Sequence, residues 1–150
     1  MSPAADRHSE LQGRIFGQLL IQGEQRGLGK ARVEGGVVLR RNPDRVVGPD
    51  AAFIANKSLP LRCAPEGYLE TIPELVVEVR SKNDTGPEVA AKVNDYLAAG
   101  VEVVWVVDDA ARTVVIHRRG AAVETLTERD ALTCEALIPG FRLPLAELFA

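Results

Sequence analysis

The chain of 150 residues contains only two cysteines and two histidines, which leaves little material for several common chemistries. Cys63 and Cys134 stand far apart and form no CxxC motif or Cys/His cluster, so neither a zinc site nor a disulfide framework is predicted. The sequence also lacks a glycine-rich phosphate loop, a GxSxG motif and an HExxH motif. These absences argue against a P-loop protein, a hydrolase with a nucleophilic triad and a zinc enzyme.

Long apolar runs are absent as well. No window approaches the roughly 18 apolar residues of a membrane-spanning helix. The first residues, MSPAADRHSE, lack the basic start and the apolar run of a signal peptide. We therefore expect a cytoplasmic protein without a membrane partner.

Charge of one sign is not concentrated in any part of the chain. The formal net charge is -3 and lysine and arginine are scattered, so binding to a polyanion would require a local basic patch. With 46% hydrophobic and 26% charged residues, the composition is that of a globular domain with one core. No repeat, low-complexity run or linker interrupts the chain, which predicts a single domain over residues 1–150.

The first half of the chain is predicted to contain one helix and paired strands. Residues 9–26 carry apolar side chains at helical spacing and end in glycines, which predicts an amphipathic helix. Residues 31–41 and 45–55 read as extended segments around an Asn-Pro-Asp turn, and we expect them to pair. The proline-rich residues 57–73 predict a loop that is unusually long for a domain of this size, and such a length needs a structural or functional explanation.

The second half alternates strand and helix. Residues 75–80, LVVEVR, predict a short strand inside a sheet that is covered on both faces. Residues 83–100 predict a helix with Asp84 or Thr85 as N-cap and Gly100 as C-cap. Residues 101–120 predict a hairpin, and the apolar tail packs along the core. The class is therefore mixed α/β, with a central sheet flanked by helices.

Glu78 stands among the aliphatic residues of the predicted strand and needs a partner. Because side chains alternate along a strand, Glu78 shares one face with Val76 and Arg80. A buried, unpaired carboxylate is costly, so it is either neutralised or held by a cation, a partner charge or hydrogen bonds. Two interpretations stay open: an ion pair between Glu78 and Arg80 on an exposed strand face, and a metal ligand at the rim of the sheet.

Two further residues bear on this choice. Lys92 flanks the apolar stripe of the following helix, beside Val89 and Tyr96, where its ammonium group reaches either a site or simply the solvent. Asp50 follows Pro49 at a turn and opens an extended segment, although Pro-Asp is also a common turn dipeptide.

Taken together, Pro49-Asp50, Glu78 at the end of an apolar strand and Lys92 on the next helix resemble a known arrangement. It is the PD-(D/E)XK nuclease active site, in the form whose lysine lies on the helix. Over nearly every residue after His8, the chain resembles the Uma2 family of restriction-endonuclease-like proteins. That resemblance rests on HSELQGRIFGQLL, VEGGVVL, VVGPDAAFI, EGYLETIPELVVEVRS, KVNDYLAAGVEVVWVVDDAARTVVIHRRG and LIPGFRLPLAELF. It implies a restriction-endonuclease-like fold with a central mixed β-sheet flanked by helices.

The resemblance also implies metal-dependent hydrolysis of phosphodiester bonds. Asp50, Glu78 and the backbone carbonyl of Val79 would hold a divalent ion, and such hard oxygen donors suit Mg²⁺ or Mn²⁺. A divalent ion of this kind polarises the phosphate and lowers the pKa of an attacking water. Lys92 would orient that water or stabilise the charge that develops on the phosphorus.

Four more residues are secondary candidates by the same resemblance. Glu34 matches an acidic position and would be an extra ligand, although an exposed glutamate at a strand end is an equal interpretation. Tyr96 would pack beside the catalytic lysine, and His8 would have a structural or substrate-facing role at the first helix. Arg80 departs from the family, which has an apolar residue there. It would hold a phosphate, substitute in part for the lysine, or pair with Glu78 and weaken metal binding.

Two other departures concern segments of the chain. Family members often carry a further N-terminal segment, whereas this chain starts almost directly at the first helix, so we expect that segment to be absent. After the strand, the family's SPS is replaced by SKND, which adds Lys82 as a contact to a phosphate backbone or as an ordinary loop lysine.

Two functions follow as hypotheses. The first is a Mg²⁺-dependent endonuclease acting on DNA, and the retention of Asp50, Glu78 and Lys92 favours it. The second is a catalytically inactive binding or assembly domain with a structural ion pair between Glu78 and Arg80. The negative net charge and the missing N-terminal segment favour this alternative. A homodimer is a family-level expectation, because a two-fold axis lets a small enzyme with one site cut both strands.

Overall fold

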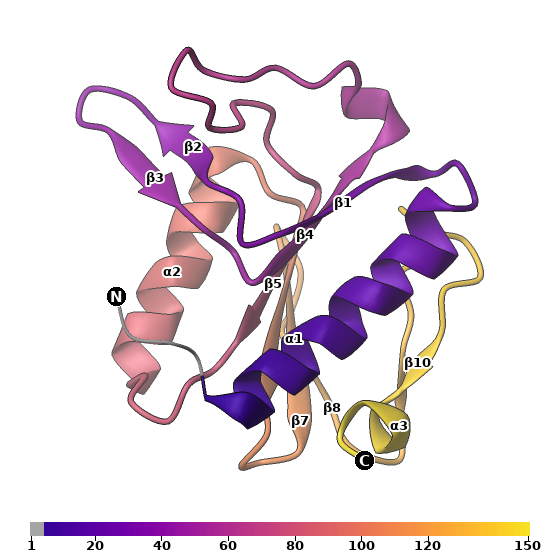
Figure 1. The fold of residues 1–150 in the computed structure, drawn as a ribbon. Coiled ribbons are helices and arrows are strands. Elements are labelled where there is room, and N and C mark those ends of the chain that lie inside the picture. Colours follow the sequence, from indigo (N-terminus) through magenta and orange to yellow (C-terminus); the bar gives the residue numbers. More distant parts are fainter. Residues whose placement is uncertain (1–4) are drawn as a thin grey trace.

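A six-stranded sheet organises residues 5–150, which the computed structural model describes (Figure 1). Its strand order is β1-β4-β5-β6-β7-β8, and every neighbouring pair is antiparallel except β5 and β6. The strands are β1 (Gly29–Val33), β4 (Ala51–Ala55), β5 (Leu75–Val79), β6 (Val103–Asp108), β7 (Thr113–Arg118) and β8 (Glu124–Leu126). The mixed α/β class expected from the sequence is confirmed.

Two small sheets complete the strands. β2 (Val37–Arg40) pairs with β3 (Arg45–Val47), and β9 (Ala131–Leu132) pairs with β10 (Leu143–Pro144). Each of the two extended segments predicted before residue 56 is therefore divided. In the first segment the break is at Glu34, which follows β1 and adopts a left-handed φ of 57°. In the second segment residues 48–50 separate β3 from β4. The outer strands of the two segments, β1 and β4, pair with each other in the main sheet. The inner strands, β2 and β3, pair with each other in a separate sheet.

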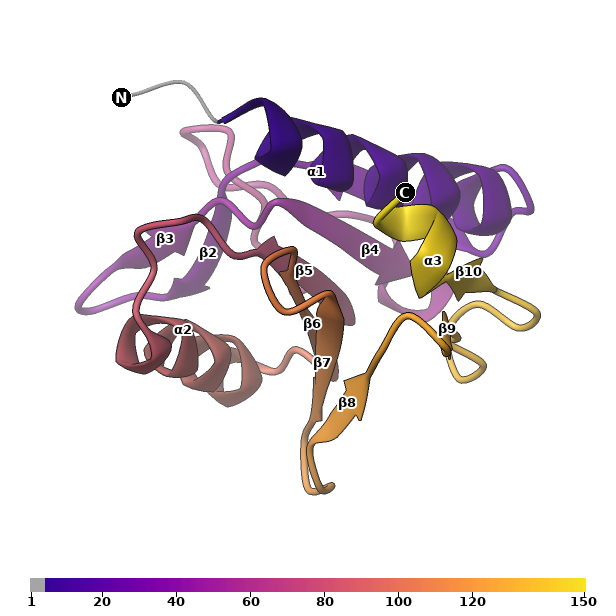
Figure 2. The ribbon, with the colours of Figure 1, turned by 90° about the horizontal axis from the view of Figure 1, so that it is seen from below.

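Helices cover both faces of the main sheet. α1 (Asp6–Leu19) continues into a π-helical turn, η1 (Leu20–Glu24), and the short α3 is Leu145–Leu148. α2 (Gly86–Ala99) is the crossover between the parallel strands β5 and β6. Figure 2 shows α1 and α3 on one side of the sheet and α2 on the other. No helix within residues 5–150 has the length and apolarity needed to cross a membrane.

The two faces of β5 belong to two separate cores. Leu75, Val77 and Val79 are buried in the core beneath α1, which also holds the apolar residues of the C-terminal tail. Val76 is buried in the smaller core beneath α2, together with Val93 and Tyr96. β5 therefore lies inside a covered sheet, as its sequence indicates, and Glu78 faces α2.

The boundaries of α2 follow from its sequence. The Thr85 hydroxyl accepts a hydrogen bond from the Glu88 N–H, and Pro87 occupies the first turn. Gly100 ends the helix with a left-handed φ of 114°, which glycine adopts without a steric penalty. The predicted hairpin of residues 101–120 is β6 and β7, which pair from Val103 with Arg118 to Asp108 with Thr113.

Candidate active site

Asp50 and Glu78 come together because β4 and β5 are antiparallel neighbours. Ala51 pairs with Val77, so one step further along both strands Asp50 lies opposite Glu78 on the same face of the sheet. Directly opposite side chains in such a pair have Cβ atoms about 5 Å apart. The two carboxyl groups interact directly, and each affects the pKa of the other.

Burial dominates the electrostatics of this pair. It raises the pKa of Glu78 to about 7, with a further rise from the charge of Asp50 and opposing effects of the Tyr96 hydroxyl and Lys92. Burial also raises the pKa of Asp50, against the lowering effect of the Val79 N–H. Two carboxyl groups in contact cannot both ionise easily, so the pair retains a proton near neutral pH unless a cation compensates it.

Asp50 is fixed by the end of β5 and by α1. Its Oδ2 accepts a hydrogen bond of 2.7 Å from the Val79 N–H, and its backbone carbonyl accepts one of 2.8 Å from Nε2 of Gln12. His8 Nε2 lies 3.1 Å from the Val79 carbonyl oxygen and 3.5 Å from Asp50 Oδ2. Because both of these atoms are acceptors, Nε2 carries the proton and donates to them. The first helix therefore orients the carboxylate.

Glu78 is held by α2. The hydroxyl of Tyr96 donates a hydrogen bond to Glu78 Oε1. Tyr96 is almost completely buried, and burial together with the charge of Glu78 raises the pKa of its hydroxyl, which keeps it a donor. Tyr96 thus contacts the carboxylate itself, which the sequence interpretation did not foresee when it placed this ring beside the lysine.

Lys92 lies on the same side of the sheet. It lines a small pocket with Glu78, Val79, Arg80 and other residues at the start of α2. Its positive charge lowers the pKa of both carboxyl groups, which places the ammonium group within electrostatic reach of the pair. The structure thus brings Asp50, Glu78 and Lys92 together from three different elements.

Arg80 does not pair with Glu78. Its guanidinium donates to the backbone carbonyl of Asp84 at 3.0 Å and lies 3.6 Å from the carboxylate of Asp108. The structural ion pair that the inactive-domain hypothesis requires is therefore wrong for this structure. The physical reason is register: the Arg80 N–H donates to the Val107 carbonyl, which aligns Arg80 with Asp108 at the end of β6, and the guanidinium contacts that carboxylate instead of Glu78.

The backbone of Glu34 lies beside the residue before Asp50, but its side chain does not join the Asp50–Glu78 pair. Its N–H donates to the carbonyl of Pro49, the residue before Asp50. Its exposed side chain makes no hydrogen bond or ion pair with any residue from 5 to 150, and it lines a different pocket from Glu78 and Lys92. The described part of the chain contains no group of three His, Cys, Asp or Glu side chains close enough to share a metal.

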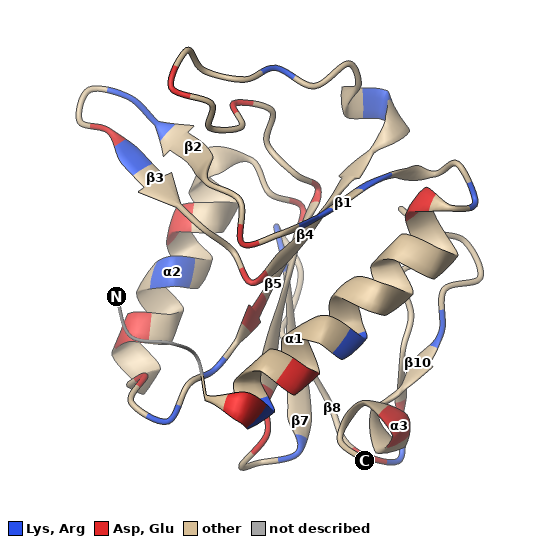
Figure 3. Cartoon of the chain, viewed as in Figure 1, with Lys and Arg blue, Asp and Glu red and all other residues tan. Residues whose placement is uncertain are grey.

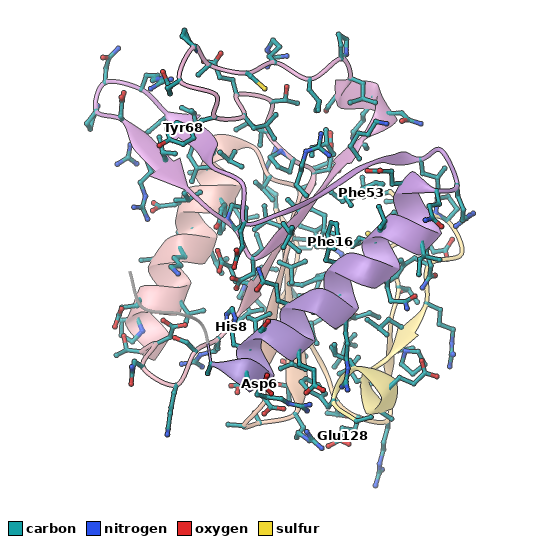
Figure 4. The ribbon with its side chains drawn as sticks, in the orientation of Figure 1. Asp6, His8, Phe16, Phe53, Tyr68 and Glu128 are labelled. Carbon is teal, nitrogen blue, oxygen red and sulfur yellow. The ribbon has the colours of Figure 1, made fainter. Side chains whose placement is uncertain are left out.

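Both main helices contribute residues around the carboxylate pair. Figure 3 shows acidic segments on β5 and at the entry to β4, and a basic segment on α2. Figure 4 shows His8 at the start of α1, directed toward the sheet. His8 and Gln12 of α1 contact Asp50, and Tyr96 of α2 contacts Glu78.

Three comparisons place this geometry among known proteins. Residues 1–146 match the family model "Uma2: Putative restriction endonuclease". The chain belongs to the Uma2 family. A search among curated proteins gave no match to this Uma2 chain.

Two solved structures resemble the Uma2 chain. The first is described as a "putative nuclease belonging to DUF820" from Anabaena variabilis. It has a TM-score of 0.82 and 17% identity, and the match covers 99% of this chain and 83% of that one. This likeness confirms the fold. A DrdV–DNA complex matches over 95% of each chain with 16% identity, and at a TM-score of 0.40 it carries no argument.

The donor set of this Uma2 site fits a hard divalent cation. Two carboxylates lie together, and the Val79 carbonyl beside them keeps a second lone pair after accepting from His8. Mg²⁺ is commonly bound by one or two carboxylates and retains several waters. Burial, and after it the charge of Asp50, raise the pKa of Glu78, and a bound cation would favour the charged form of this carboxyl group.

Gln12 is the residue that sequence reasoning missed. It is buried and makes its hydrogen bond to the Asp50 carbonyl from the same face of α1 as His8. The available signal was the spacing, because positions i and i+4 of a helix lie on one face. A buried glutamine on an otherwise apolar stripe needs a partner.

Proposed function

We propose that the protein is a metal-dependent endonuclease that hydrolyses phosphodiester bonds of DNA with Mg²⁺ or Mn²⁺. The observation that carries this proposal is that Asp50 and Glu78 lie opposite each other on adjacent strands in a partly buried site, where each affects the pKa of the other and Lys92 lines the adjoining pocket. Such a pair is unfavourable by itself and becomes favourable when a cation is bound.

Each residue has a distinct part in the proposed reaction. Asp50, Glu78 and the Val79 carbonyl would hold the ion, which polarises a phosphate oxygen and lowers the pKa of a bound water. The ammonium group of Lys92 would orient the attacking water or stabilise the charge that develops on the phosphate. His8 and Gln12 would keep Asp50 oriented, and Tyr96 would do the same for Glu78.

The inactive-domain alternative loses its main structural support. It requires Arg80 to neutralise Glu78, and Arg80 instead contacts Asp84 and Asp108. Arg80 therefore does not neutralise the carboxylate pair. Homodimerisation and cytoplasmic location stay predictions.

The test is cleavage of supercoiled plasmid by the purified protein at low salt with Mn²⁺, Mg²⁺ or EDTA. We expect metal-dependent nicking that disappears in Glu78→Gln. The matched control is Glu74→Gln, because Glu74 is also buried and accepts hydrogen bonds from the Ala55 N–H and the Ser58 hydroxyl, away from the site. This control should keep cleaving. Circular dichroism checks that both variants are folded.

Calorimetric titration with Mn²⁺ separates the remaining cases. Binding to the wild type but not to Glu78→Gln, without cleavage of the plasmid, would mean that the substrate offered was the wrong nucleic acid. If the wild type neither binds Mn²⁺ nor cleaves the plasmid, the nuclease proposal is refuted in favour of a non-catalytic domain.

A further inference from the structure

A second pocket opens beside the candidate active site and has no part in the proposed hydrolysis. Its volume is about 160 Å³, and its walls come from the connection between β1 and β2, from β4 and from the long loop before β5. The lining includes Arg32, Glu34, Val37, Ala52, Leu61 and Cys63. This pocket gives the long loop of residues 57–73 a role, because the loop forms one of its walls.

The pocket and the carboxylate pair share one face of the sheet. Asp50 and Ala52 are two positions apart at β4, so their side chains point the same way and are about 7 Å apart along the strand. Ala52 pairs with Arg32 on β1 and with Val76 on β5, which extends this face across three strands. A group in the pocket is therefore next to a group held at Asp50.

The size and lining of the pocket suit one small aromatic ring. Cavities of about 150 Å³ hold one benzene-sized ring, and the wall includes the aliphatic side chains of Val37, Ala52, Leu61 and Leu69. Arg32 donates from Nη1 to the Ala31 carbonyl, and its other donors have no partner in residues 5–150. The Glu34 carboxylate is likewise without a partner there. The pocket thus offers apolar walls with one donor group and one acceptor group.

We propose that this pocket binds one unpaired pyrimidine base of the DNA substrate, next to the phosphodiester held at Asp50 and Glu78. The inference rests on the proposed nuclease function and adds a determinant of substrate choice. Cytosine fits best, because its amino group donates to a carboxylate such as that of Glu34 while its ring acceptors receive hydrogen bonds from Arg32. A purine has a second ring, which exceeds the volume.

Tyr68 adds a surface for the neighbouring base. It is 44% exposed, and it lies between Gly67 and Leu69, which both line the pocket. Its ring packs so closely over Gly36 that a side chain at position 36 would collide with it. Figure 4 shows Tyr68 over β2. Exposed aromatic rings of this kind stack on nucleic-acid bases.

Cys63 provides a probe inside the pocket. Its thiol is exposed, whereas Cys134 is partly buried and burial raises the pKa of that thiol to about 11. N-ethylmaleimide reacts with thiolates, so it should label Cys63 selectively and place its bulk in the pocket. Mass spectrometry verifies the position of the adduct, and Cys63→Ser taken through the same treatment is the matched control.

The experiment measures labelling and binding with fluorescent single-stranded oligonucleotides of one length: oligo-dC, oligo-dT, oligo-dA and an abasic strand. Ca²⁺ replaces Mg²⁺ so that strands are held while hydrolysis is slowed. We expect oligo-dC to slow labelling of Cys63 at least fivefold and the abasic strand to leave it unchanged. Labelling should weaken binding of oligo-dC about tenfold, without effect on treated Cys63→Ser.

A second variant tests the pocket without chemistry. Gly35 lines the pocket, and a Cβ at this position meets no atom within 4 Å, so Gly35→Leu adds bulk at the pocket wall without a clash at Cβ. It should lose the preference for oligo-dC and keep Mn²⁺ binding.

Equal protection by the abasic strand and oligo-dC, or unchanged binding in both modified proteins, would overturn the pocket assignment. The nuclease proposal would survive that result if Glu78→Gln still abolished plasmid cleavage. Failure of every strand to bind would also overturn the pocket assignment, and plasmid cleavage by the wild type and Glu78→Gln would then decide the nuclease proposal separately.

Discussion

The carboxyl group of Glu78 should destabilise the folded protein at neutral and basic pH when no metal is bound. Its pKa in the folded protein is about 7, compared with an ordinary value of 4.5. Between these two values the folded state keeps a proton that the unfolded state releases. The free energy of unfolding therefore falls as the pH rises from about 4.5 to about 7, and then levels off. The difference corresponds to about 3 kcal/mol as an upper bound.

Substitution of Glu78 by glutamine removes this charge and keeps the shape. The amide oxygen of glutamine can still accept the hydrogen bond from Tyr96. In EDTA at pH 8 we expect Glu78→Gln to be more stable than the wild type by as much as about 3 kcal/mol, and at pH 5 to be nearly equal to it. For a domain of this size, 3 kcal/mol corresponds to roughly 6–12 °C in Tm.

Urea denaturation at both pH values measures the effect, and thermal melting provides a second measurement. Glu74→Gln is again the control, and we expect it to lose stability because Glu74 accepts two hydrogen bonds within the fold. Mg²⁺ should stabilise the wild type at pH 8 and leave Glu78→Gln unchanged, since a ligand stabilises only the state that binds it. A Glu78→Gln protein that is less stable than the wild type at pH 8 would refute the reasoning.

Three further predictions concern the neighbours of the carboxylate pair. Lys92→Ala should lower DNA cleavage about 100-fold in the plasmid assay while Mn²⁺ binding by calorimetry persists, and full activity would exclude Lys92 from the reaction. Gln12→Ala removes the donor to the Asp50 carbonyl, so it should lower the free energy of unfolding by about 1–3 kcal/mol and weaken Mn²⁺ binding about tenfold. A loss of stability without weaker Mn²⁺ binding would show that Gln12 is purely structural. Tyr96→Phe should raise the pKa of Glu78, which moves the pH midpoint of Mn²⁺ binding upward, and an unchanged midpoint would show that the hydroxyl has no influence.

The elements of the fold could be predicted from local signals. The apolar run of β5, the Thr85 and Gly100 caps of α2 and the β6–β7 hairpin are each encoded within a few neighbouring residues. The split of the extended segments into β1–β4 and β2–β3 could not be predicted in this way. It depends on the left-handed backbone at Glu34 and on pairing between strands that are distant in sequence.

The candidate site likewise contains residues that could be predicted from the sequence and contacts that could not. Asp50, Glu78 and Lys92 could be selected because a carboxylate inside an apolar strand requires compensation and a family pattern offers a reason for it. Gln12 and Tyr96 could not be predicted as their hydrogen-bond partners, since these contacts depend on how α1 and α2 pack on opposite faces of the sheet. Such contacts arise from tertiary packing, which periodicity within one segment does not encode.

Arg80 shows why a shared strand face alone does not identify a partner. Strand alternation places Arg80 on the same face as Glu78, and an ion pair between them would have neutralised the site. In the structure the Arg80 N–H donates to the Val107 carbonyl, which aligns Arg80 with Asp108, and the guanidinium contacts Asp108 and the Asp84 carbonyl instead. The cation nearest in sequence is thereby held elsewhere, and the carboxylate pair keeps the repulsion that a divalent ion would relieve. A structural ion pair at Glu78 would stabilise the metal-free fold. The arrangement observed here lacks that ion pair, so on the proposed function the charge of Glu78 is left for a metal ion to compensate.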